Sequence, residues 1–109
     1  MRIAKVYHNE RLAGTLMQHH SKSYEFCYED DWFLNASMPA ISLTLPKTQQ
    51  SYYSDHLFPF FFNMLSEGVN RKLQCRQLKI DEHDYFSLLL ATAGKDTIGA
   101  ITIKPVENP

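Results

Sequence analysis

An aromatic segment near the middle of the chain limits most strongly what this sequence can fold into. Residues 54–71 read SDHLFPFFFNMLSEGVNR. Apolar side chains recur there at i, i+3, i+4, i+7 and i+8, the spacing of a helix lying on a core, at Leu57, Phe60, Phe61, Met64 and Leu65. Phe58 and Phe62 form a second apolar face of the same helix. This helix therefore needs cover on two sides, from the rest of the chain or from a partner.

Residues with strong positional preferences mark the ends of this predicted helix. Ser54 or Asp55 can cap its N-terminus, because a side-chain oxygen can accept a hydrogen bond from the first turn. Pro59 is tolerated only close to a helix start, so the regular helix is predicted to begin between Asp55 and Pro59. Gly68 is predicted to end the helix, since glycine readily adopts the left-handed conformation found at helix C-termini.

The first third of the chain predicts two β-hairpins. Residues 3–7 and 12–16 are β-prone, and they are joined by a polar turn in which Asn9 is the residue most tolerant of a positive φ. The segment 24–28 then alternates aromatic residues with polar or small ones, which is the period of a strand. After an acidic turn, residues 32–34 are predicted to return as the second half of another antiparallel pair.

The remaining chain predicts further elements of both kinds. Residues 41–45 alternate as a short strand does, whereas residues 47–53 carry no clear pattern. Two more helices are predicted, one capped by Asn70 and one capped by Asp81. Residues 97–103 are apolar or small on both faces, which predicts a final strand inside the sheet and not at its edge.

The order of these elements predicts the fold class. A chain of 109 residues is long enough for one core and too short for two, and no repeat or linker divides it, so residues 1–109 are expected to form a single domain. Strands come first, then helices, then one strand. This order predicts an α+β fold: a small, mainly antiparallel sheet of hairpins, about three helices packed on one face, and a returning C-terminal strand.

Charge and hydropathy argue against several classes of partner. Eleven basic and twelve acidic residues give a formal net charge of −1, which disfavours direct binding to nucleic acid because that binding depends largely on phosphate neutralisation. No apolar run approaches the roughly 18 residues of a membrane span, and the N-terminus lacks a signal-peptide pattern, so a cytoplasmic protein is expected. Cys27 and Cys75 are most simply reduced thiols, with a disulfide as the alternative.

The sequence contains no recognisable catalytic or metal-binding pattern. Its five histidines are scattered, and no CxxC or HExxH motif is present. The acidic run 29–31 is better explained as a solvated turn than as a calcium loop, which needs about six spaced oxygen ligands. The four glycines are isolated, so no phosphate-binding loop is predicted. We therefore expect no enzymatic activity, no cofactor and no metal, and a binding or structural role instead.

A few residues stand out as candidates for contacting a partner. Trp32 is either a core residue or an interface residue, since tryptophan, tyrosine and arginine dominate interface energies. The polar loop 67–71 is either a turn between helices or the edge of a docking surface flanked by aromatic side chains. The candidate partner-binding residues are Trp32, Phe58, Phe62, Glu67 and Arg71.

Several stretches together resemble the small N-terminal subdomain of the HipA family, the serine/threonine kinase toxins of bacterial toxin–antitoxin modules. The stretches that carry the resemblance, in the family's order, are KVYHNERLAGTL, YEFCYEDDWF, PAISLTLP, FFFNMLSEGVNR and DTIGAITI. The family's helix-end signature usually reads Asn, Leu, Leu, Pro, Glu, Gly. Here Met64 replaces the first leucine and Ser66 replaces the proline, which alters the rigidity of the turn but not the resemblance.

The resemblance implies a role next to a kinase. In HipA this subdomain is followed by a much larger kinase body. Residues 1–109 contain no catalytic segment of such a body. A free-standing subdomain of this kind is similar to HipS, the small protein of split HipBST modules, which accompanies a shorter kinase, HipT, and a DNA-binding protein, HipB. The resemblance thus implies a non-catalytic antitoxin that binds and inhibits a HipT-like kinase, with a HipB-like protein in the same complex, touched directly or only through the kinase.

A second role from a different class stays open. The chain would then be a structural subunit that completes a HipA-like kinase and supports its activity or substrate recognition. The two roles predict opposite signs when the chain is titrated into a kinase assay. In either case, at least one of the five candidate residues is expected to be required for binding without being required for folding.

Overall fold

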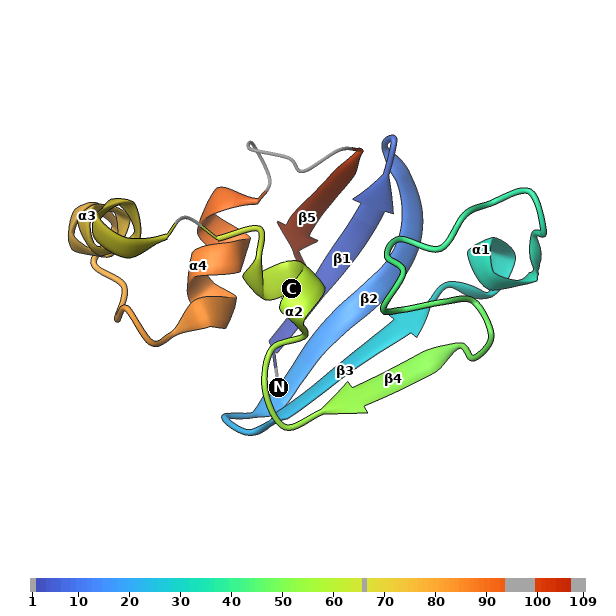
Figure 1. Cartoon of the computed structure of the whole chain (residues 1–109), viewed down its shortest axis with the longest axis horizontal. Coiled ribbons are helices and arrows are strands. Elements are labelled where there is room, and N and C mark those ends of the chain that lie inside the picture. Colours follow the sequence, from blue (N-terminus) through green and yellow to red (C-terminus); the bar gives the residue numbers. More distant parts are fainter. Residues whose placement is uncertain (1, 66, 94–99, 107–109) are drawn as a thin grey trace.

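The computed structural model of the chain describes residues 2–65, 67–93 and 100–106. These residues form one five-stranded antiparallel sheet in the order β4-β3-β2-β1-β5, together with four helices (Figure 1). The elements are β1 Arg2–His8, β2 Arg11–His20, β3 Ser23–Tyr28, α1 Asp30–Leu34, β4 Ser51–Ser54, α2 Pro59–Phe62, α3 Gly68–Leu78, α4 Tyr85–Thr92 and β5 Ile101–Pro105. The predicted α+β class, with an antiparallel sheet and a returning C-terminal strand, is confirmed.

The first hairpin forms as the sequence predicts. Asn9 and Glu10 connect β1 to β2 with φ angles of 49° and 67°, the two positive values that a tight hairpin turn matching the strand twist requires. Gly14 pairs with Val6 in this hairpin. A Cβ at Gly14 would lie 2.7 Å from both the carbonyl oxygen of Cys27 and the ring of Phe26, so only glycine fits there.

The aromatic alternation of β3 supplies the centre of the core. Tyr24, Phe26 and Tyr28 are all buried, as the period of two predicts. The ring of Phe26 lies 5.7 Å from that of Phe61 in the α2 region, and Tyr24 lies 6.5 Å from Phe86 on α4, measured between ring centroids. Helices α2 and α4 therefore cover one face of the sheet, while α3 lies at the end of the molecule beyond α4 (Figure 1). No helix in the described part of the chain is long and apolar enough to span a bilayer.

The single long helix predicted between residues 54 and 71 is wrong. Only the four residues of α2 are helical before the chain turns at Asn63, and Gly68 begins α3 instead of ending a helix. Gly68 has a φ of 57°, which no continuous right-handed helix accommodates. The predicted core residues nevertheless reach the core: Leu57, Phe61 and Leu65 are buried, and Phe60 and Met64 pack partly buried against them.

The second hairpin predicted for residues 32–34 is also wrong, because those residues belong to α1. Asp30 and Asp31 occupy the first turn of α1, where negative charge favours a helix N-terminus. The strand that pairs with β3 on its free side is β4, which lies in the segment predicted to have no element. Trp32 is turned into the core by α1, and its Nε1–H donates a hydrogen bond to the carbonyl oxygen of Pro39 at 2.9 Å.

The strand predicted at residues 41–45 is replaced by an irregular segment tied to the core by one side chain. The hydroxyl of Tyr28 accepts a hydrogen bond from the Ile41 N–H at 3.0 Å and donates one to the carbonyl oxygen of Leu45. These backbone groups would otherwise need a neighbouring strand. The Tyr28 hydroxyl thus satisfies two backbone groups that a neighbouring strand would otherwise pair with.

Two positions near the C-terminus also differ from the predictions. Among the described residues, strand β5 pairs with β1 alone and lies at an edge of the sheet, so its predicted interior place is wrong. Its apolar residues Ile101 and Ile103 are buried, and α4 contacts this strand. The predicted start of this strand, residues 97–99, lies outside the described residues. The cap of α4 is Asp84 and not Asp81, and α3 begins at Gly68, two residues before the predicted cap Asn70.

Candidate functional site

Three helices meet at a cluster of two aromatic rings and one guanidinium. Phe62 from α2 and Tyr85 from α4 pack edge to face, with their ring centroids 5.0 Å apart and their planes at 85°. The guanidinium carbon of Arg71, from α3, lies 5.5 Å from the centroid of Phe62 and 5.7 Å from that of Tyr85. These distances are within the range of cation–π attraction. We call Phe62, Arg71 and Tyr85 the Arg71 cluster.

A small apolar pocket opens beside the Arg71 cluster. Its volume is about 290 Å³, and it is lined by His56, Leu57, Pro59, Phe62, Asn63 and Tyr85. Tyr85 and Phe62 belong to both the pocket and the cluster. An apolar concavity next to an arginine and a tyrosine is the arrangement in which binding energy concentrates at protein interfaces. It can accept an apolar side chain from a partner while the arginine contacts a neighbouring acidic or carbonyl group.

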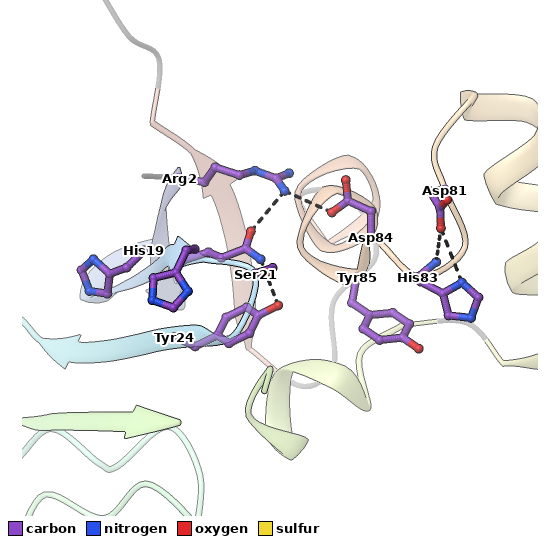
Figure 2. Close-up of a pocket in the computed structure, with 10 residues that line it drawn as sticks. Arg2, His19, Ser21, Tyr24, Asp81, His83, Asp84 and Tyr85 are labelled. Carbon is purple, nitrogen blue, oxygen red and sulfur yellow. Dashed lines mark hydrogen bonds and ion pairs between the residues drawn. The ribbon is translucent and has the colours of Figure 1, made fainter. Parts of the chain in front are cut away.

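A larger and more polar pocket shares Tyr85 with the apolar one (Figure 2). Its volume is about 560 Å³, and the β2–β3 turn and the loop before α4 form its walls. Arg2 reaches across it, donating to Gln18 at 3.2 Å and to Asp84 at 3.1 Å (Figure 2). Because these charged and polar groups pair with one another, the pocket holds β1 against the start of α4.

Asp84 is the centre of that pairing. Its side chain caps α4 by accepting hydrogen bonds from the N–H and the hydroxyl of Ser87, at 3.2 and 2.7 Å. Partial burial alone would raise the pKa of Asp84, but the hydrogen bonds from Ser87 and Arg2 outweigh it and hold the pKa below its ordinary value of 3.8. The carboxylate is thus kept ionised as a cap and ion-pair partner, which is a structural role.

The structure brings two of the five candidate residues into contact and places a third at the start of α3. Phe62 and Arg71 stack in the Arg71 cluster. Glu67 is exposed at the N-cap position of α3, where its side chain makes no capping hydrogen bond. Glu67 therefore presents a carboxylate at the start of the helix that carries Arg71.

The other two candidate residues lie apart from this group. Phe58 is only 7% exposed and packs against Phe61, with ring centroids 6.3 Å apart. Trp32 is 3% exposed and sits on α1, near His8, at the opposite end of the molecule from α3 (Figure 1). An edge of Trp32 still lines a separate pocket of about 290 Å³.

Sequence reasoning missed Tyr85 as a site residue. Tyr85 follows the cap of α4 directly and is 23 positions from Phe62 by the numbering of the chain, so no local pattern joins the two. The same holds for His56 and Asn63, which flank α2 and complete the apolar pocket. Within the described residues, no group of three or more His, Cys, Asp or Glu side chains is placed to hold a metal ion, and Cys27 and Cys75 are free thiols.

Comparison with known proteins identifies the family. Residues 4–104 match the family model of the HipA N-terminal domain. A solved structure titled as the N-terminal domain of HipA toxin superposes with a TM-score of 0.73 and 26% sequence identity, covering 100% of this chain and 96% of that one.

Two relatives show this domain in different settings. An uncharacterised protein of Haemophilus influenzae is 32% identical over 104 residues, covering 95% of this chain and 92% of that protein. Y4mE of Sinorhizobium fredii, provisionally named a kinase, is 26% identical over 108 residues, and this chain spans only 26% of its length. On the match of residues 4–104, the chain belongs to the HipA N-terminal domain family.

Proposed function

We propose that the chain is a non-catalytic antitoxin that binds a HipT-like serine/threonine kinase toxin and inhibits it. The family supports a role together with a kinase, because a relative provisionally named a kinase contains this domain. This chain covers only 26% of that relative, which is therefore about four times as long. The Haemophilus influenzae relative consists almost entirely of this domain, which supports a role as a separate protein.

The observation that carries the proposal is the Arg71 cluster with its adjoining apolar pocket. The cluster joins α2, α3 and α4 at the surface, so a partner bound there contacts three elements at once. An apolar side chain of the kinase would enter the pocket lined by Phe62 and Tyr85. Arg71 would then be shielded from water between its two rings and the kinase, which strengthens its electrostatic contacts.

The direction in which the chain changes kinase activity tests the proposal. The purified chain is titrated into an autophosphorylation assay of the purified HipT-like kinase. We expect the activity to fall to a plateau at one equivalent of bound chain. A chain that neither associates with the kinase nor lowers its autophosphorylation contradicts the antitoxin function.

Variants of the Arg71 cluster test the surface separately from the function. Arg71→Ala and Phe62→Ala are each expected to weaken kinase binding by roughly 30-fold, the effect of losing a residue worth about 2 kcal/mol at an interface. Lys5→Ala and Tyr53→Ala are the controls, because both residues are exposed and line neither the apolar pocket nor the pockets at Trp32 and Arg2. Affinity is measured by calorimetry, and circular dichroism with thermal melting checks the fold of each variant.

If both cluster variants fold and still bind as tightly as the controls, the kinase contacts another surface. The pockets at Trp32 and at Arg2 are then the next places to substitute. The antitoxin function itself would stand, since inhibition is measured independently with the unchanged chain.

A second candidate function is a structural subunit that supports a HipA-like kinase. The observation that favours it is the presence of this domain inside the longer, provisionally kinase-named relative. The same titration separates the two functions, because a supporting subunit would raise autophosphorylation or phosphorylation of a substrate protein. Inhibition excludes this alternative.

The antitoxin acts within a larger complex. We place it in the cytoplasm, in one complex with the kinase and a HipB-like DNA-binding protein. The net charge of −1 supports contact with DNA only through that third protein. A mobility-shift assay is expected to show no shift of operator DNA with this chain alone, and a shift only when the HipB-like protein is present.

A further inference from the structure

Helix α3 makes little use of the rest of the molecule. Among its 11 residues, Cys75 is the only buried one. Val69 and Leu73 are 72% and 47% exposed, although both are large apolar residues. Arg71 attaches the inner side of the helix to the Arg71 cluster, and Figure 1 shows α3 at one end of the molecule. One side of α3 is thus left unoccupied by residues 2–65, 67–93 and 100–106.

The unoccupied side of α3 is strongly basic. Lys72 and Arg76 are four residues apart on this side of α3, with Lys72 at its border, where it lines a small pocket together with Arg71 and Tyr85. Lys79 follows as the left-handed C-cap of the helix, and all three basic residues are exposed. From Gly68 to Ile80 the sequence contains no acidic residue. Within residues 2–65, 67–93 and 100–106, none of these three side chains takes part in an ion pair.

Val69 and Leu73 form a second stripe directly beside the basic one. They are four residues apart, and on a helix of 3.6 residues per turn they lie next to Lys72 and Arg76. The outer face of α3, which we define as Val69, Lys72, Leu73 and Arg76 together with the C-cap residue Lys79, therefore combines apolar area with positive charge. The whole chain carries a net charge of −1, so this positive charge is local and not a property of the molecule.

This arrangement is unfavourable for an isolated helix. Helices of fewer than about 12 residues are marginal in water, and like charges four residues apart destabilise them further. Exposed valine and leucine add no stability to the free chain. A surface of opposite charge that covers the apolar stripe would remove each of these costs on binding.

We propose that the outer face of α3 docks on an acidic surface of the kinase that also offers an apolar area for Val69 and Leu73. This inference deepens the proposed function and rests on it, because it names the chemistry of the partner's surface. A protein surface is favoured over nucleic acid, since the apolar stripe lies within the basic face and the net charge of the chain is negative.

Charge reversal with a matched control tests the proposal. One variant carries Lys72→Glu, Arg76→Glu and Lys79→Glu. The control carries Lys5→Glu, Lys22→Glu and Lys104→Glu, three exposed basic residues outside α3, so the two variants have the same net charge. We expect the α3 variant to bind the kinase at least about tenfold more weakly, chiefly through slower association, and the control to stay within about twofold of the unchanged chain.

The apolar stripe is tested with a second pair of variants. Val69→Ser with Leu73→Ser is expected to weaken binding by about tenfold through faster dissociation. Leu34→Ser with Leu43→Ser is the control, because these leucines are 78% and 100% exposed and lie outside α3. Affinity is measured from 50 mM to 500 mM salt, and the dependence on salt should be shallower for the α3 charge variant than for the unchanged chain.

The outcomes separate this inference from the function on which it rests. If the unchanged chain binds the kinase and the α3 charge variant binds equally well, the docking face is refuted while the antitoxin function stands. If the unchanged chain binds no kinase, both are refuted. If the α3 variant keeps its kinase affinity but loses binding to duplex DNA that the unchanged chain shows, α3 is a nucleic-acid element and the inference is wrong.

Discussion

At the scale of single residues, Tyr28 links the sheet to the segment that replaces a predicted strand. Its hydroxyl is buried between the backbone groups of Ile41 and Leu45. We predict that Tyr28→Phe lowers the free energy of unfolding by about 2–3 kcal/mol, because it leaves a buried N–H and a buried C=O without a partner. Tyr53→Phe, at a 72% exposed side chain, is the control and should change stability by less than about 0.5 kcal/mol. Urea unfolding measures both, and equal stabilities would contradict this role for the hydroxyl.

At the scale of elements, Asp84 fixes the start of α4 and ties it to β1. Its pKa is below its ordinary value of 3.8 in the folded chain, so the unfolded chain takes up the proton first as the pH falls. The stability that the ionised Asp84 carboxylate contributes is therefore complete above about pH 4, and it is lost as the pH falls through the pKa of Asp84 in the folded chain. We predict that Asp84→Asn, which keeps a good N-cap but cannot titrate, loses less stability between pH 5 and pH 2.5 than the unchanged chain. Thermal melting across this range measures the difference.

Asp81→Asn is the control for that prediction. The Asp81 side chain is 75% exposed, and its partner among the described residues is the nearby His83, which is also largely exposed. Its variant should follow the pH profile of the unchanged chain. If Asp84→Asn still loses stability steeply as the pH falls, other carboxylates govern acid unfolding.

At the scale of the whole molecule, stability should be unevenly distributed. The central strands β1 and β2 carry Ala4, Val6, Ala13 and Leu16, all with 0% exposure, whereas α3 buries one residue. We predict that the amides of α3 exchange with solvent by local opening, and those of β1 and β2 only by global unfolding. Hydrogen exchange followed by mass spectrometry measures this. Equal protection of α3 and β2 in the free chain would contradict it, and added kinase should slow exchange in α3 if its outer face is bound.

The sequence predicted well wherever local chemistry settles the structure. The turn at Asn9 and the burial of Tyr24, Phe26 and Tyr28 follow from backbone preference and from the period of a strand, and both are confirmed. The predictions that are wrong involve short segments in which two local preferences compete. In α1, the acidic first turn favours a helix over the strand that the aromatic residues predict. At Gly68, a positive φ interrupts the single helix that the apolar spacing predicts for residues 54–71.

The candidate site shows where the sequence stops being sufficient. Phe62 and Arg71 could be selected in advance, because aromatic and arginine residues near a polar turn are typical of interfaces. Their contact with Tyr85 could not, since three separate helices bring these side chains together. For the same reason Phe58 and Trp32 were reasonable candidates, and only the packing shows them in the core.

By itself, then, the sequence determined the fold class, the first hairpin, the buried face of β3 and the family resemblance, because each depends on which residues follow one another along the chain and at what spacing. The tertiary structure alone decided which further strand pairs with β3, where the aromatic segment breaks, and which side of α3 the described residues leave uncovered. These features depend on contacts between residues far apart in sequence, where burial of apolar area and satisfaction of backbone hydrogen bonds are settled for the whole chain at once.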